Sequence, residues 1–149
     1  MAETILVIPA LTQGMVAGGR MLLANLDQLG IPIEAAFWRL DEEVPMWYLV
    51  LASRQVRTDG SLAMYRKIDK VLGKLQLRDT IWIGMVSIVD PRVRIVQALA
   101  GALGMTESAG GIHLDNATFD GVHISACLIY RLAAKPKTKV RNGRAAAAE

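Results

Sequence analysis

Residues 33–53, IEAAFWRLDEEVPMWYLVLAS, predict two β-strands joined by a short loop. Segments 33–40 and 46–53 are rich in β-branched, aromatic and other apolar residues, which is typical of strands. The polar segment 41–45 between them has the length of a hairpin loop. We therefore predict an antiparallel hairpin with an acidic tip. The second strand is apolar at almost every position, which predicts that it is covered on both faces or lies centrally in the sheet.

Helical periodicity predicts three helices around this hairpin. Apolar residues recur at spacings of three and four over residues 13–29, 61–75 and 91–103. Gly30 stands where a helix often ends, with Pro32 shortly after it. Asp90 and Pro91 are typical of a helix start, with Asp90 as the N-cap.

Three further strands are predicted at residues 80–88, 112–114 and 122–132, the last two joined through 116–121. The order is helix, hairpin, helix, strand, helix, hairpin. This order favours an α+β domain over a doubly wound parallel sheet. We expect one mixed, largely antiparallel sheet of about five strands with three helices packed on it, formed by residues 1–132. Residues 133–149 are read as a flexible basic tail.

The net positive charge of the chain lies in this tail. Residues 133–149 hold five Lys or Arg against one acid, a net charge of +4, so residues 1–132 hold the other twelve cations against thirteen acids, a net charge of −1. The isoelectric point near 9.2 is therefore a property of the tail and not of the folded body. A basic isoelectric point alone does not support nucleic-acid binding here.

Composition excludes several classes of protein. A lone cysteine, Cys127, excludes an internal disulfide and any CxxC redox or zinc motif. No Lys or Arg precedes the apolar residues 5–8, so the basic region of a signal peptide is missing. The sequence contains no stretch of 18 or more apolar residues, so we expect no membrane span. We expect a soluble cytoplasmic protein without a membrane partner, and no motif indicates a cofactor or a metal site.

The glycines and acids of the chain are better explained by structure than by chemistry. Gly14, Gly18 and Gly19 match neither a Walker A nor a GxGxxG pattern, and we interpret them as small residues that allow their helix to pack closely on a neighbour. The carboxylates of the 41–43 acidic run point in different directions at a hairpin tip, so we interpret them as a solvated turn. A lone thiol such as Cys127 is typically a buried apolar residue.

His113 and His123 form the candidate ligand site. A loop centred near Thr118 would place these histidines roughly opposite each other on paired strands, with Asp115 and Asp120 in the intervening loop as candidates for a third ligand. No HExxH or His-x-His spacing supports a metal centre there. A polar, half-exposed strand face is the simpler interpretation of the same residues.

Basic residues form two candidate binding elements. Arg66, Lys70 and Lys74 recur at i, i+4 and i+8 and form a ridge on the second helix, with Lys67 beside it. The tail carries its cations at alternate positions: Lys135, Lys137, Lys139 and Arg141. Either element suits phosphate contacts, although the tail has no aromatic residue to stack on bases. An ordinary solvated helix face and a solubilising or linker-like tail are the alternatives.

Three functions remain open from sequence. The first is a non-enzymatic interaction protein that binds a protein partner or itself. The second is a nucleic-acid-associated protein that uses the ridge and the tail, and the third is a ligand site or enzyme near the histidines. Trp38, Trp47 and Trp82 all fall in predicted strands, and an exposed one would mark a binding face.

Overall fold

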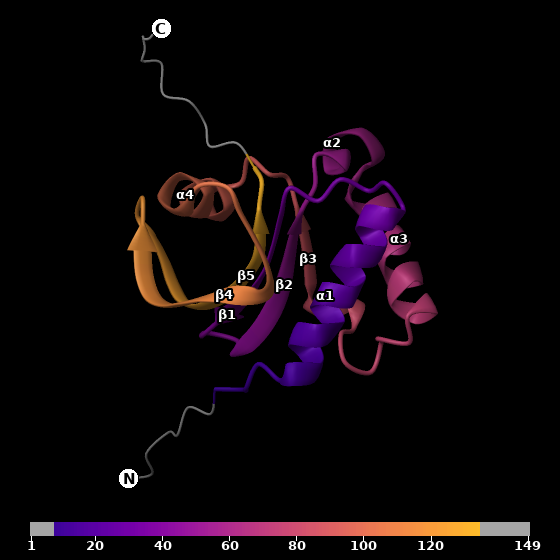
Figure 1. The fold of residues 1–149 in the computed structure, drawn as a ribbon, viewed down its shortest axis with the longest axis horizontal. Coiled ribbons are helices and arrows are strands. Elements are labelled where there is room, and N and C mark those ends of the chain that lie inside the picture. Colours follow the sequence, from indigo (N-terminus) through magenta and orange to yellow (C-terminus); the bar gives the residue numbers. More distant parts are fainter. Residues whose placement is uncertain (1–7, 135–149) are drawn as a thin grey trace, which may run out of the picture.

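The structure, a computed structural model, describes residues 8–134. Within them a single mixed sheet carries helices on both faces, which confirms the predicted α+β class (Figure 1). The helices are α1 (Gln13–Gln28), α2 (Gln55–Asp59), α3 (Ser61–Lys74) and α4 (Arg94–Leu103), with a 3-10 turn η1 (Ile83–Met85). The strands are β1 (Ala35–Asp41), β2 (Met46–Ala52), β3 (Val86–Val89), β4 (Thr106–Phe119) and β5 (Val122–Leu132).

The five strands lie in the order β3-β2-β1-β5-β4. Strand β3 runs parallel to β2, and the other neighbours are antiparallel. Strands β1 and β2 form the predicted hairpin, with Ala35 opposite Ala52 and Asp41 opposite Met46. The N–H of Ile88 on the edge strand β3 donates to the Tyr65 hydroxyl of α3 at 3.0 Å, so that helix also covers part of the sheet edge.

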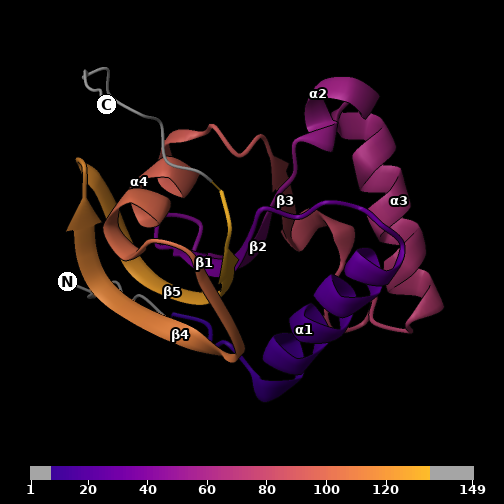
Figure 2. The same ribbon diagram turned by 45° about the horizontal axis from the view of Figure 1, so that its top comes forward.

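Alternate residues of the central strands enter two different cores. Trp38 and Leu49 face α1 and α3, whereas Phe37 and Val50 face α4. Figures 1 and 2 show the corresponding layers, with α1 and α3 side by side on one face of the sheet and α4 on the other. The prediction that β2 is covered on both faces is confirmed, because successive side chains of a strand point to opposite faces.

Helix α1 approaches the sheet closely at Gly19. Trp38 Nε1 donates to the Tyr130 hydroxyl at 2.9 Å, and that hydroxyl donates to the Val16 carbonyl at 2.6 Å. A Cβ atom at Gly19 would lie only 2.6 Å from the Tyr130 oxygen. Burial raises the pKa of Tyr130 to about 12. Gly18 and Gly19 therefore serve close packing, as predicted, whereas Gly14 is exposed and does not.

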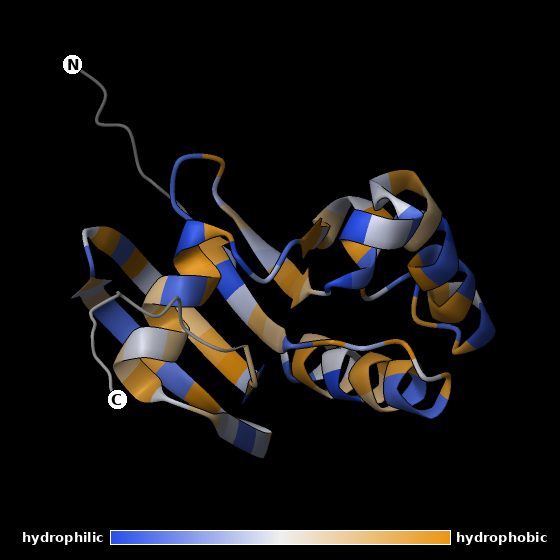
Figure 3. Cartoon of the chain, turned by 90° about the horizontal axis from the view of Figure 1, so that it is seen from above, coloured by the Kyte–Doolittle hydropathy of each residue, from blue (hydrophilic) through white to orange (hydrophobic). Residues whose placement is uncertain are grey.

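Strands β4 and β5 form a long ribbon that curls around α4 (Figure 2). Hydrophobic and hydrophilic residues alternate along it (Figure 3). Its turn is Asp120-Gly121, with φ of 50° and 76°, which matches the two-residue turn that favours this hairpin twist. Asn116, with φ of 49°, interrupts the alternation, so Leu114 and Phe119 both pack on the α4 side.

The segment predicted as a strand at 80–88 is corrected by the structure. Regular pairing begins only at Val86, and the preceding residues form η1, in which the Met85 N–H donates to the Trp82 carbonyl at 2.9 Å. The Trp82 ring lies over Gly84, where a Cβ would be 2.0 Å from the ring. Trp82 is 57% exposed and lies outside the sheet.

Two other boundaries differ from the predictions. Helix α4 begins at Arg94 and not after Asp90, because Asp90 Oδ1 instead accepts the Arg92 N–H at 2.8 Å in a turn before the helix. Ionic hydrogen bonds from Arg92 lower the pKa of the Asp90 carboxyl. Strand β4 is much longer than the predicted 112–114, and its turn falls after the expected loop centre. Among residues 8–134, no helix is both long and apolar enough to cross a bilayer.

Candidate functional site

The end of α1 places two apolar residues on the surface beside α3. Gly30 adopts φ of 75°, and the Ile31 N–H bonds the Leu26 carbonyl while the Gly30 N–H bonds the Asp27 carbonyl, both at 3.0 Å. This pattern is a Schellman motif, which confirms the predicted role of Gly30. Leu29, which periodicity placed on the buried face, is 53% exposed because it forms the cap itself.

Helix α3 supplies the opposite wall. Met64, Ile68 and Leu72 are fully buried against the sheet, and Val71 is 5% exposed at the margin of this face. The polar face carries the predicted ridge, so all four predicted cations are exposed: Arg66, Lys67, Lys70 and Lys74. An amphipathic helix on a sheet must turn its charged face outward, which explains the exposure without a function.

A groove of about 410 Å³ lies between these two elements. Its floor is apolar and its rim is cationic. Three apolar and three basic residues line it: Leu29, Ile31, Val71, Lys67, Lys70 and Lys74. We call this feature the lysine groove.

The cations of the lysine groove are not equivalent. Lys67 Nζ lies 2.8 Å from Asp59 Oδ2, and this hydrogen bond lowers the pKa of Asp59. Lys70 and Lys74 make no ion pair within residues 8–134, and Asp69, the acid nearest to them on α3, is 3.2 Å from Arg78 instead. The two unpaired lysines can therefore receive an anion, and Arg66 of the predicted ridge is not among the lining residues.

No protein-family model, curated protein or solved structure matches this chain. The chemistry of the lysine groove itself must therefore indicate what it binds. Apolar contact in the floor and positive charge at the rim together suit a ligand that is both apolar and acidic.

The histidine site expected from sequence is not assembled. His113 pairs with Leu128, and His123 pairs with Thr118, because the turn falls at Asp120. His123 and Leu128 are five residues apart on β5, roughly 17 Å at strand rise. Thr118 Oγ1 lies 3.1 Å from His123 Nδ1, so each histidine has a local partner instead.

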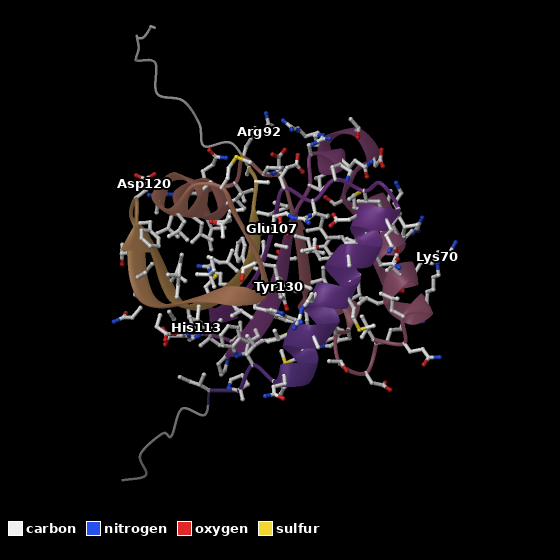
Figure 4. All side chains as sticks on the ribbon, in the orientation of Figure 1. Lys70, Arg92, Glu107, His113, Asp120 and Tyr130 are labelled. Atoms are coloured by element: carbon white, nitrogen blue, oxygen red, sulfur yellow. The ribbon has the colours of Figure 1, made fainter. Side chains whose placement is uncertain are left out.

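Asp115 does contact one of the predicted residues, since its Oδ2 lies 3.5 Å from His113 Nδ1. Both side chains are more than half exposed, so the pair is solvated. In the part of the chain that the structure describes, no group of three His, Cys, Asp or Glu is placed to hold a metal ion. Figure 4 shows His113 on the opposite side of the molecule from Lys70.

The ridge and the tail do not start from the same face. Tail cations Lys135, Lys137, Lys139 and Arg141 lie outside the described residues. Ala134, the last described residue, packs in the core on the α4 face, whereas the ridge lies on α3 across the sheet. The Arg131 guanidinium at the end of β5 is also occupied, by Asp27 at 2.7 Å and Glu107 at 2.8 Å.

Sequence reasoning found the cationic half of the lysine groove and missed its apolar half. Leu29 and Ile31 flank the predicted Gly30 cap, and a Schellman motif places these two positions beside the helix end. That motif was the available signal. Nothing in the sequence indicated that α3 would lie beside it.

Proposed function

We propose that this chain is a small non-enzymatic interaction protein whose lysine groove binds an acidic segment of a protein partner. The observation that carries the proposal is the combination of an apolar floor at Leu29, Ile31 and Val71 with the unpaired Lys70 and Lys74 at the rim. A nucleic-acid backbone would use the lysines but leave the floor without a partner. A peptide with leucine and glutamate side chains satisfies both.

Helix α1, whose C-cap residue Leu29 lines the lysine groove, carries further exposed apolar residues. Its outward positions Ala17, Met21 and Ala24 are exposed and uncharged, and Met21 is 49% exposed. An amphipathic partner helix could therefore lie along α1 and direct its acids toward α3. Methionine adapts its shape to different apolar partners.

A reducing compartment, such as the cytoplasm, suits this proposal. Cys127 is buried, and burial raises the pKa of its thiol to about 12, so the group is unreactive in the fold. It contributes apolar packing on the α4 side.

A peptide titration tests the proposal. The probe is a labelled peptide of Glu and Leu with Leu at i, i+3, i+4 and i+7, and NMR follows the methyl groups of Leu29, Ile31 and Val71. We expect these methyl signals to shift, with affinity falling as salt rises because the rim is exposed. Changing Lys70 and Lys74 together to Glu should weaken binding by at least about tenfold.

The matched control is Arg66→Glu, which makes the same charge change as either lysine substitution alone, on the same helix but outside the lysine groove. It should leave peptide binding nearly unchanged. A single-stranded oligonucleotide is the competing probe. If it binds more tightly than the peptide and Arg66→Glu weakens it as much as the Lys70 and Lys74 changes do, the ridge binds nucleic acid and the proposal is overturned.

A further inference from the structure

The tip of the β1–β2 hairpin has the chemistry that the lysine groove selects. Glu42, Glu43 and Val44 are exposed there, and Val44 is 55% exposed. The turn is held in place, since the Glu43 N–H donates to Asp41 Oδ1 at 3.0 Å and Ser125 Oγ donates to Glu42 Oε1 at 2.6 Å. An exposed valine thus stands next to acids on a preorganised turn.

The carboxylates of the tip form no ion pair within the described residues. Within residues 8–134, neither Asp41, Glu42 nor Glu43 forms an ion pair with a Lys, Arg or His side chain. The same holds for Lys70 and Lys74 of the lysine groove. The molecule therefore presents an acidic hairpin tip with an exposed valine, and an apolar groove in which Lys70 and Lys74 have no partner of opposite charge within residues 8–134.

We propose that the lysine groove receives the β1–β2 hairpin tip of a second copy of this chain. The proposal rests on the function proposed above and names the occupant of the same site. Val44 would contact Leu29 on the floor, and the glutamates would face Lys70 and Lys74. Complementary charges of this kind determine orientation and register between partners.

The contact must form between two molecules. Leu29 and Ile31 precede the start of β1, whereas the tip follows its end, and the seven residues of β1 separate them by roughly 20 Å. The two surfaces also differ, so each copy in a pair keeps one free tip or one free groove. Such a head-to-tail contact generates either a closed ring or an open chain.

The test uses two full-length charge-reversal variants. One carries Lys70→Glu with Lys74→Glu, and the other carries Glu42→Lys with Glu43→Lys. In sedimentation velocity, we expect the wild type to gain mass as its concentration rises, less so at high salt. Each variant alone should remain monomeric, because its tip and groove then carry the same sign of charge.

Mixing the two variants is the decisive measurement. The positive tip of the Glu42→Lys, Glu43→Lys variant fits the negative groove of the Lys70→Glu, Lys74→Glu variant. The negative tip of the groove variant likewise fits the positive groove of the tip variant. Association should therefore return in the mixture only. Arg66→Glu is the control and should associate like the wild type. Circular dichroism and thermal melting of each variant check that it is folded.

The outcomes separate the two proposals. A wild type that stays monomeric at every concentration, while the Glu and Leu peptide still binds in a Lys70- and Lys74-dependent way, overturns self-recognition and leaves the groove as a site for another protein. A wild type that stays monomeric and also fails to bind the peptide rejects both proposals. Self-association that survives in both variants alone would show that another surface is responsible and would also reject the hairpin as occupant.

Discussion

At the scale of single residues, Gly19 determines how near α1 lies to the sheet. Its missing side chain leaves room for the Tyr130 hydroxyl, which links the Trp38 indole to the Val16 carbonyl. Each hydrogen bond in such a buried chain contributes about 1 kcal/mol, and an unmade one costs more. The close approach therefore couples the helix backbone to the centre of the sheet.

Replacing Gly19 with Ala should destabilise the protein by about 1–3 kcal/mol. Alanine favours a helix by about 1 kcal/mol, but its Cβ would overlap the Tyr130 oxygen, and overpacking outweighs that gain. Urea unfolding measures the change. Gly14→Ala is the matched control, because its Cβ would have 3.8 Å to the nearest atoms, and it should be neutral or stabilising. Equal effects at both positions would contradict the packing argument.

At the scale of elements, the helix ends position the lysine groove. Helices α1 and α3 both finish in Schellman motifs, the first with Gly30 in the left-handed region and the second with Gln76, whose φ is 56°. A non-glycine residue in that region costs roughly 1–2 kcal/mol, so the α3 cap is the strained one.

Gln76→Gly should stabilise the protein by about 0.5–1 kcal/mol, because relief of strain exceeds the added freedom of glycine in the unfolded chain. Gln76→Ala keeps the Cβ atom and should change the free energy of unfolding very little. Thermal and urea unfolding of the two variants compare them directly. Destabilisation by Gly alone would mean that the strain at this cap is negligible.

At the scale of the whole molecule, Arg131 joins segments far apart in the chain. Its side chain is 16% exposed, and its guanidinium binds Asp27 of α1 through two nitrogens at 2.7 and 2.9 Å. It also donates to Glu107 of β4 at 2.8 Å and to the Ile33 carbonyl at 3.3 Å. These bonds raise the pKa of Arg131 further, so it is charged at every accessible pH.

Arg131→Lys should lower the free energy of unfolding by about 1–3 kcal/mol. It should also loosen the end of α1 together with the start of β4. Lysine keeps the charge but cannot make the bidentate contact with Asp27 while reaching Glu107. Hydrogen exchange should increase in both segments. The control is Arg54→Lys, at an ion pair whose arginine is 61% exposed, where the change should stay below about 1 kcal/mol. Similar losses at both sites would contradict the special role of Arg131.

Local patterns determined much of this protein. The apolar runs on either side of residues 41–45 predicted the β1–β2 hairpin, and Gly30 predicted the end of α1, because strand alternation and left-handed caps depend on neighbouring residues alone. The cations of α3 were placed correctly on an exposed face for the same reason.

Long-range packing determined the position of the turn at Asp120, the exposure of Trp82 and the formation of the lysine groove. The turn determines which residues of β4 and β5 face each other, and a shift of a few residues separated His113 from His123. The groove needs Leu29 at the end of α1 and Val71 on α3, and these two residues meet only when both helices pack on the sheet. Such contacts join residues distant in sequence, and their geometry follows from the packing of the whole core.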